Sequence, residues 1–233
     1  MMRINAGQNN PSIFDHNYVE REGRVRALKR MLDREYKGER SSFTRENPAL
    51  LLDLGGGTSP YEELAREMPV TWISLDIKKY NRTNVIAAAN GLPFGPNVFD
   101  AVLCTQVLGY VPNVYTAVEE IRRILKPGGT AILTEAAVFP SYGLGARWRI
   151  LPEGWKTLLS RFSTCDVSSD CKTVASFFRI MNLYLAILLQ DIPIVETLWR
   201  LSLCPFFNLA GRWANDRFRD IGFAANYIVV ARK

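Results

Sequence analysis

The stretch Leu50–Thr58, which reads LLLDLGGGT, decides the fold. A continuous apolar run of this kind is typical of a strand that is buried on both faces of a parallel sheet. The glycines that follow allow the backbone to approach a ligand closely and to adopt positive φ angles. Ser59 is predicted to cap a helix over residues 60–67, whose free N–H groups would face an anion. The stretch therefore predicts a strand, a ligand-binding loop and a helix in succession.

Position 60 narrows the class of ligand. A dinucleotide-binding fingerprint has a third glycine at this position, whereas this chain has Pro60. The loop therefore favours a carboxylate or a ribose over a pyrophosphate. It also argues against a NAD-dependent enzyme on a related fold.

Strands and helices alternate on both sides of this loop. Helices are predicted over residues 17–37, from Asn113 to a turn at residues 126–129, and over residues 152–161. Further strands are predicted over residues 70–76, 84–88, 98–105, 130–134, 163–168 and 226–231. This alternation predicts an α/β fold: a Rossmann-like, doubly wound, mostly parallel seven-stranded sheet with helices on both faces.

The segment over residues 172–213 is apolar and is predicted to be helical, with interruptions near Pro193 and Pro205. Its most apolar part, residues 177–189, is too short to cross a membrane, which needs about 20 apolar residues. It is interpreted as a packed helix, a lid over the site or an interfacial helix, and packing is preferred. Aromatic residues beside arginines keep peripheral membrane contact through residues 177–213 as an alternative.

The chain has 233 residues and a formal net charge of +6, and the basic excess is uneven. The balance is +3 over residues 1–48, −2 over residues 49–135 and +5 over residues 136–233. Basic flanks fit an anionic substrate, a membrane surface or nucleic acid. No run of lysines and arginines is dense enough to choose among these partners.

A metal site is not expected, because the chain has one histidine and its four cysteines form no C-x-x-C pair. The first residues, MMRINA, lack the apolar segment of a secretory signal. The expected setting is the cytoplasm, with a peripheral position at the inner membrane surface as the alternative.

A second signal for a nucleoside lies 19 residues after Gly57, where Asp76 ends a predicted strand. A carboxylate at that sheet edge can accept hydrogen bonds from both hydroxyls of a ribose. Three further motifs follow in order: Asn90–Phe94, Val107–Val111 and Ile121–Gly129.

With these motifs and their spacing, residues 51–135 resemble the core of class I S-adenosylmethionine-dependent methyltransferases of the type 11 group. The resemblance implies a methyltransferase domain over residues 49–233, with a helical insertion at about 172–213, after an N-terminal helical segment and linker over residues 1–48. It implies S-adenosylmethionine as cofactor, S-adenosylhomocysteine as product and no metal. The cofactor-binding residues that it implies are Asp53, Gly55, Gly56, Gly57, Asp76, Ile77, Ala89, Asn90, Gly91, Leu92, Thr105 and Gln106.

Two positions depart from the family pattern. The family often has an acidic residue where this chain has Ala88, and Asn90 is the candidate to replace its bond to the adenine amino group. The family often has Glu-His where this chain has Gly109-Tyr110. A catalytic histidine therefore does not carry over to that position.

The acceptor is indicated by shorter stretches. Residues 58–61, 148–155 and 226–233 resemble bacterial methyltransferases associated with cell-surface polysaccharide or glycolipid synthesis. This resemblance implies O-methylation of a small-molecule, sugar or lipid-linked sugar acceptor. The candidates for a general base are His16, Glu135 and Tyr110, and Arg147 and Arg149 are candidates to bind a substrate phosphate or carboxylate.

Other readings of the same residues stay open. A nucleic-acid methyltransferase agrees with the charge, but the chain lacks an N/D-P-P-Y type motif. A protein that uses the fold only to bind S-adenosylmethionine agrees with the departures at Ala88 and Gly109. A homodimer is also compatible with the apolar segment.

Overall fold

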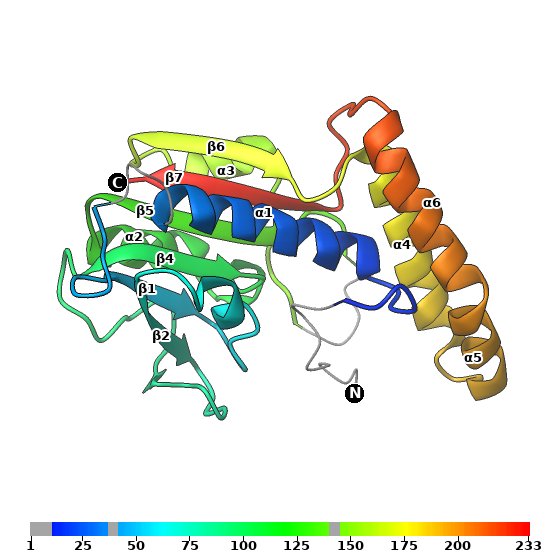
Figure 1. Ribbon diagram of the computed structural model, residues 1–233, viewed down its shortest axis with the longest axis horizontal. Helices are drawn as coiled ribbons and strands as arrows, with labels where there is room; N and C mark the ends of the chain where they lie inside the picture. Colours follow the sequence, from blue (N-terminus) through cyan, green and yellow to red (C-terminus); the bar gives the residue numbers. More distant parts are fainter. Residues whose placement is uncertain (1–10, 37–41, 140–144) are drawn as a thin grey trace. The chain divides into compact units, whose positions relative to one another are not determined.

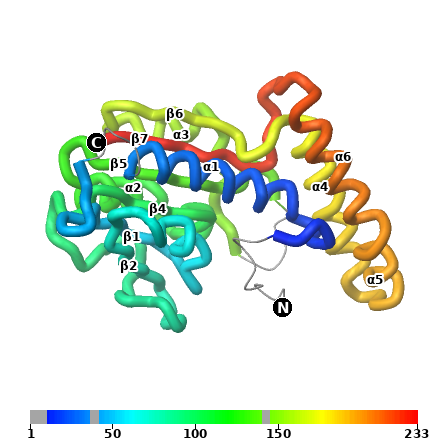
Figure 2. The backbone as a smooth tube through the Cα atoms, in the orientation of Figure 1, coloured from blue at the N-terminus to red at the C-terminus, as the bar shows by residue number. Residues whose placement is uncertain are grey.

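The computed structural model describes residues 11–36, 42–139 and 145–233, which form two compact units. The sheet unit consists of the described residues within 28–136, 145–168 and 227–233. The helical unit consists of residues 11–27, 137–139 and 169–226. The trace of the chain through both units can be followed by colour in Figure 2.

Seven strands form one sheet in the order β3-β2-β1-β4-β5-β7-β6, with helices on both faces (Figure 1). The strands are β1 (Ala49–Leu54), β2 (Val70–Asp76), β3 (Val85–Ile86), β4 (Phe99–Thr105), β5 (Leu125–Ala136), β6 (Thr164–Ser169) and β7 (Asn226–Arg232). The five strands from β3 to β5 run parallel to their neighbours. The order reverses at β1 and β4, and ligands bind at such a point in open α/β sheets.

β7 runs antiparallel to both of its neighbours. Backbone bonds join Gly128 and Gly129 near the start of β5 to Lys233, and Ala137 beyond its end to Ala225. On the other side Ser163 donates to Arg232. The sheet is therefore mixed, and the expectation of a mostly parallel seven-stranded sheet is confirmed with this refinement.

Buried apolar side chains on β1, β4 and β5 make the core of the sheet. The helices of this part are α1 (Tyr18–Tyr36), α2 (Val114–Ile124) and α3 (Pro152–Leu158), with short 3-10 helices η1 (Glu62–Ala65) and η2 (Leu108–Tyr110). α2 begins as predicted, because the Asn113 side chain accepts a hydrogen bond from the Thr116 N–H at 3.2 Å. Its apolar stripe, including Ala117 and Ile121, is fully buried.

Two local predictions were wrong. The helix expected over residues 60–67 is only the 3-10 helix η1, and Ser59 does not cap it because its side chain is buried beside Asp53. Residues 126–129 do not form a turn: α2 ends at Ile124 and β5 starts at once, because Gly128 and Gly129 pair with the end of the chain. The interruptions predicted near Pro193 and Pro205 are both present, because α4 ends at Leu189 and α5 begins at Pro193, and α5 ends at Leu201 and α6 begins at Leu203.

The helical unit contains α4 (Thr173–Leu189), α5 (Pro193–Leu201) and α6 (Leu203–Arg217), together with the first half of α1. Pro193 stands at the first position of α5, where a missing N–H costs nothing. Pro205 lies in the first turn of α6, where its missing N–H also costs nothing, so it does not interrupt that helix. No helix in the described ranges is both long and apolar enough to cross a membrane.

Candidate cofactor-binding site

The glycine loop lies on a buried carboxylate. Asp53 at the end of β1 is only 1% exposed, and a side chain at Gly56 would overlap its Oδ2. The side chains of Ser59, Trp72 and Ser74 are neighbours of this carboxylate or of Gly56. Asp53 therefore supports the loop from below, and its predicted part in cofactor binding stays a prediction.

Polar atoms in this cluster lack partners. Among the described residues, no group forms a hydrogen bond of regular geometry with either Asp53 oxygen, and the same holds for Ser59 Oγ, Ser74 Oγ and Trp72 Nε1. Burial raises the pKa of Asp53 to about 7, although the Ser59 hydroxyl and the Trp72 indole N–H oppose this rise. The carboxyl group is thus close to half protonated at neutral pH.

The raised pKa gives a stability prediction with a definite sign. In the unfolded chain Asp53 loses its proton near its ordinary pKa of 3.8, whereas the folded chain keeps it up to about 7. Between these values the unfolded state binds fewer protons, so the free energy of unfolding falls as pH rises, and the loss is complete above pH 7. Asp53→Asn removes this loss. Its free energy of unfolding relative to wild type should increase from pH 4 to pH 7 by on the order of a few kcal/mol.

Urea unfolding of both proteins at intervals across this pH range measures the difference. Titrations elsewhere in the chain cancel in the comparison, because both proteins share them. A difference that does not vary with pH would show that the Asp53 carboxyl titrates normally.

The loop and the second strand meet at Gly57. Its N–H donates to Asp76 Oδ2 at 3.0 Å, and Asp76 Oδ1 accepts from the Lys78 N–H at 3.0 Å. Gly57 has a φ of +57°, and no heavy atom lies within 4 Å of where its Cβ would be. A carboxylate has about four lone-pair sites, so Asp76 can still accept from two ribose hydroxyls. The next residue, Ile77, is 68% exposed and offers an apolar surface beside that position.

The loop after β3 continues the same edge of the sheet. Ala89 and Leu92 are buried, whereas Asn90 and Gly91 are exposed. Glu120 of α2 accepts from the Leu92 N–H at 2.8 Å.

The side chains of Glu120 and Arg123, both on α2, hold this loop in place. Arg123 donates to the carbonyls of Leu92 at 3.1 Å and Phe94 at 2.8 Å, and it also pairs with Glu120 at 2.7 Å. The sequence analysis missed this clamp, although Arg123 lies within one of the quoted motifs. Only its three-residue spacing from Glu120 on a helix could have indicated the pair.

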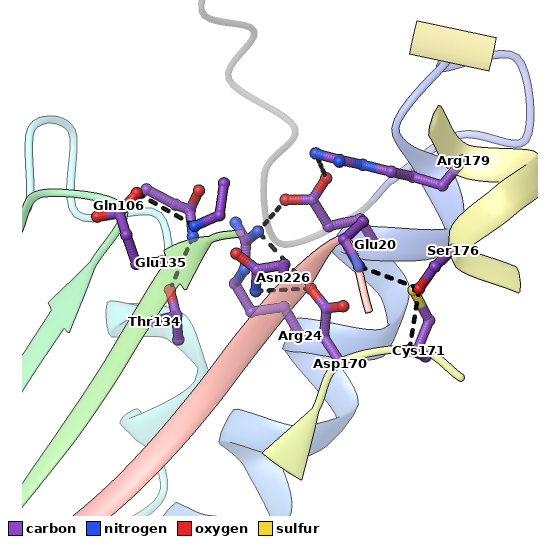
Figure 3. Close-up of polar contacts among 12 residues, drawn as sticks. Glu20, Arg24, Gln106, Thr134, Glu135, Asp170, Cys171, Ser176, Arg179 and Asn226 are labelled. Carbon is purple, nitrogen blue, oxygen red and sulfur yellow. Dashed lines mark hydrogen bonds and ion pairs between the residues drawn. The ribbon is translucent and has the colours of Figure 1, made fainter. Parts of the chain in front are cut away.

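The carboxyl end of β4 supplies Thr105 and Gln106, both half-buried. Gln106 has a φ of +58°, an uncommon conformation for a residue other than glycine and one that collects at functional sites. Its side-chain Nε2 lies 3.2 Å from Thr134 Oγ1, and its N–H donates to the Thr134 carbonyl at 2.8 Å (Figure 3). The structure thus fixes Gln106 at the edge where the methionine part of the cofactor was predicted.

Gly109 is explained by Glu135. The Glu135 carboxylate, 1% exposed, accepts from the Gly109 N–H at 2.7 Å and from the Ala136 N–H at 3.1 Å. The Gly109 carbonyl in turn accepts from the N–H groups of Arg147 at 2.6 Å and Trp148 at 3.1 Å. Glu135 therefore anchors η2 and, through Gly109, the segment that carries Arg147.

Gly109→Ala should destabilise the sheet unit. A Cβ atom at this position would lie 2.8 Å from Glu135 Oε1, so the carboxylate would have to leave the Gly109 N–H. The loss of a buried charge-assisted hydrogen bond costs about 1.5–3 kcal/mol. Chemical denaturation should show this decrease, and Gly91→Ala, at an exposed loop position with no neighbouring atom, is the control. Equal stability of the two variants would contradict the anchoring role of Glu135.

Tyr110 and Arg149 lie close to this anchor. Burial and the charge of Glu135 raise the pKa of Tyr110, and the charge of Arg149 opposes the rise. Arg147 is exposed and Arg149 is half-buried, with its guanidinium donating to the Trp148 carbonyl at 2.9 Å. The structure thus gathers four of the five predicted catalytic and substrate residues in the sheet unit.

His16, the fifth, belongs to the helical unit. Burial and the charge of Arg21 lower its pKa, and the charges of Asp15 and Glu20 oppose this shift only in part. Its imidazole is therefore neutral at pH 7.

These features fit S-adenosylmethionine. The open side of Gly57, the spare acceptor sites of Asp76 and the exposed Ile77 suit a nucleoside with free ribose hydroxyls. The fold and the loop together define a Rossmann-like, nucleoside-binding class of protein.

Comparison with known proteins identifies the family of this domain. Residues 52–133 match the family model of a methyltransferase domain. An uncharacterised protein of Methanocaldococcus jannaschii is 33% identical over 96 residues, which cover 39% of this chain and 42% of that protein. The chain therefore matches less than half of the length of this relative.

Solved structures share the fold. A SAM-dependent methyltransferase from Archaeoglobus fulgidus has a TM-score of 0.53 at 14% identity, over 92% of this chain and 97% of that chain. The cyclase SpnF has a TM-score of 0.56 at 20% identity, over 90% of this chain and 80% of that chain. Residues 52–133 thus match a methyltransferase domain, and the sheet around them has the fold of the SAM-dependent methyltransferase from Archaeoglobus fulgidus.

Proposed function

We propose that this chain transfers a methyl group from S-adenosylmethionine to an oxygen atom of a small-molecule, sugar or glycolipid acceptor. The observation that carries the proposal is the junction of Gly57 with Asp76, open on one side, in a domain of the methyltransferase family. The fold alone would not indicate the reaction, because the similar chain SpnF is described as a cyclase.

The chain's own residues would position the cofactor. Asp76 would accept hydrogen bonds from the ribose hydroxyls. Ile77 and Leu92 would border the adenine, and Thr105 and Gln106 would face the methionine part. When bound, S-adenosylmethionine supplies a methyl group that its sulfonium charge already activates. Alignment of the acceptor oxygen with this methyl group and exclusion of water are then the main tasks of the protein.

The acceptor class is supported by the arginines beside η2. A backbone bond holds Arg147 next to Gly109, and the charge of Arg149 acts on Tyr110. Guanidinium groups suit phosphate or carboxylate groups. The resemblance of residues 58–61, 148–155 and 226–233 to methyltransferases of cell-surface polysaccharide and glycolipid synthesis supports a sugar or lipid-linked sugar.

Methyl transfer to a hydroxyl releases a proton, and the three candidate bases differ in their capacity to accept it. Glu135 already accepts hydrogen bonds from two backbone N–H groups, which suits a residue that anchors η2 and not a general base. Tyr110 has a raised pKa, so its phenol keeps its proton at neutral pH and can only orient an acceptor. His16 is neutral because its pKa is lowered, which is the protonation state that a base requires.

The catalytic role predicted for His16 has its own test. His16→Gln should lower the rate of methyl transfer by about 100-fold and should remove the fall in rate at acidic pH. Because the pKa of His16 is lowered, that fall should lie below pH 6.5 in wild type. An unchanged rate and pH profile would exclude His16 as the base.

The decisive experiment follows the formation of S-adenosylhomocysteine from S-adenosylmethionine with fractionated bacterial polysaccharide, glycolipid and small-molecule pools. Turnover with a sugar-containing pool, absent in Asp76→Ala, would support the proposal. Tight cofactor binding without turnover on any pool would favour a binding protein, an alternative that the Gly109 departure supports. Turnover on nucleic acid alone, at a rate that falls steeply with salt concentration, would show that the acceptor is nucleic acid and not a sugar or small molecule.

A further inference from the structure

Helices α4 and α6 of the helical unit bury polar and small side chains. Asn182 of α4 donates to Asn208 Oδ1 of α6 at 3.0 Å, and both residues are fully buried. Gly211 of α6 packs against the Phe178 side chain and the Ala175 backbone of α4. The α4–α6 contact therefore buries amide side chains and small residues, beside the stacked rings of Phe178 and Phe207, whose centroids lie 6.1 Å apart.

Several large apolar side chains of α4, α5 and α6 are nevertheless exposed. We define the outer apolar surface by two exposed residues on each helix: Phe177 and Leu188 on α4, Ile194 and Leu198 on α5, and Phe206 and Trp213 on α6. Each of these side chains is more than half exposed. Figure 2 shows α4, α5 and α6 following one another along the chain.

So many exposed apolar residues are unusual for helices in contact with water, which turn their apolar stripe to the core. Small residues and amide side chains between helices, with large apolar residues outside, are typical of helices that contact lipid. None of the described helices can cross a membrane, so the lipid contact would lie within one surface of a bilayer.

The geometry of α5 favours lipid over a protein partner. Of its nine residues only Trp199 is buried and only Glu196 is half-buried. Ile194, Leu198 and Leu201 repeat at helical spacing along its exposed side. A helix exposed on most of its circumference is enclosed more readily by fluid acyl chains than by the surface of a second folded protein.

Basic and aromatic residues lie together at the end of α6. The guanidinium of Arg217 lies over the Trp213 ring, with 5.6 Å between its Cζ and the ring centroid, and Phe218 packs against the same ring. Arg212 and Arg219 are exposed in the same stretch. Aromatic rings beside arginines suit the headgroup region, where the arginines would meet anionic phosphates.

We propose that the outer apolar surface of α4–α6 inserts into the surface of a bilayer that contains anionic lipids. This inference does not depend on the methyl-transfer reaction. It is consistent with an acceptor that is lipid-linked, but its test requires no acceptor.

The test is flotation of the full chain with vesicles of phosphatidylcholine and phosphatidylglycerol. Leu198→Glu combined with Phe206→Glu should reduce the vesicle-bound fraction at least about tenfold, because two exposed apolar contacts become charged. Leu151→Glu is the matched control, since Leu151 is 59% exposed in the sheet unit and Leu198 is 63% exposed. Arg217→Gln should reduce the preference for vesicles with phosphatidylglycerol over vesicles of phosphatidylcholine alone.

Two results would overturn the proposal. Wild type that stays at the bottom of the gradient with both kinds of vesicle would show that this surface does not bind lipid. A stable dimer of wild type that does not float, and that the double variant converts to monomer, would show that a second copy covers the surface. Circular dichroism confirms that each variant is folded. Calorimetric binding of S-adenosylhomocysteine shows separately whether the cofactor site is intact, so a failure of lipid binding is distinguished from a failure of the cofactor site.

Discussion

Asp76→Ala is expected to weaken the binding of S-adenosylmethionine and S-adenosylhomocysteine by roughly 100-fold or more. Each charge-assisted hydrogen bond contributes about 1.5–3 kcal/mol, and about 1.4 kcal/mol corresponds to a tenfold change in affinity. The substitution removes the acceptor for two ribose hydroxyls. It also releases the Gly57 N–H, which donates to Asp76 Oδ2 at 3.0 Å, so the loop loses part of its support. Calorimetric titration of both ligands measures the change.

The control is Asp100→Asn, because Asp100 is also a half-buried carboxylate of the sheet unit. It accepts from the Leu50 N–H at 2.9 Å and pairs with Lys126 at 2.9 Å, near the starts of β1 and β4 and away from the cofactor edge. It should lower stability without changing the dissociation constant of S-adenosylhomocysteine. Well-folded wild type that binds neither ligand would exclude the methyltransferase proposal.

The sheet could be predicted from the sequence because its strands are apolar runs with clear ends. β2 has the predicted bounds, and β1 and β4 differ from prediction by a residue or so. The turn predicted at residues 126–129 was wrong for a non-local reason. Its glycines pair with Lys233, and local glycine and proline signals carry no information about that distant partner.

The edge of the sheet that would bind the ligand was predictable from the sequence, but the buried residues that support it were not. Asp76 and Gly57 lie together as their spacing indicated. Asp53 was predicted as part of the cofactor loop, and the structure adds that it is buried beside side chains from the loop and from β2. Ser74 stands opposite Asp53 in the β1–β2 register, which only the strand pairing reveals.

The helical unit shows a different limit. Residues 177–189 were interpreted as a packed helix because the run is too short to cross a membrane. In the structure Arg179 of this helix is 1% exposed, whereas Phe177 and Leu188 are more than half exposed. Composition predicted the helices, but their orientation depends on which polar groups find partners inside, and those partners are distant in sequence.

The largest effect on stability is expected at Arg179. It pairs with Glu20 of α1 (Figure 3) and donates to the Val138 carbonyl at 3.0 Å. Glu20 also pairs with Arg24, which lies 3.8 Å from Asp170. Removal of one partner from a buried ion pair leaves an uncompensated charge and costs about 3–5 kcal/mol. Arg179→Leu should therefore lower the free energy of unfolding by about this amount.

The double variant Glu20→Gln with Arg179→Leu separates the effect of the ion pair from the effect of burying its two charges. Replacement of both ions by neutral groups of similar size is often neutral or stabilising, so the double variant should recover most of the loss. The excess of the two single losses over the loss in the double variant is the interaction energy of the pair. An additive result would show that the pair does not hold α1 to α4.

The pH dependence of the stability that Arg179→Leu loses identifies the cause of that loss. Burial raises the pKa of Glu20, but the charges of Arg179 and Arg24 outweigh burial and hold that pKa below its ordinary value of 4.5. A lowered pKa contributes stability that is present above pH 4.5 and is lost as pH falls through the folded-state pKa. Urea unfolding should therefore show a difference between wild type and Arg179→Leu that narrows below pH 4.5. A constant difference across that range would mean that Arg179 stabilises the helical unit by packing and by its bond to Val138, and not by its charge.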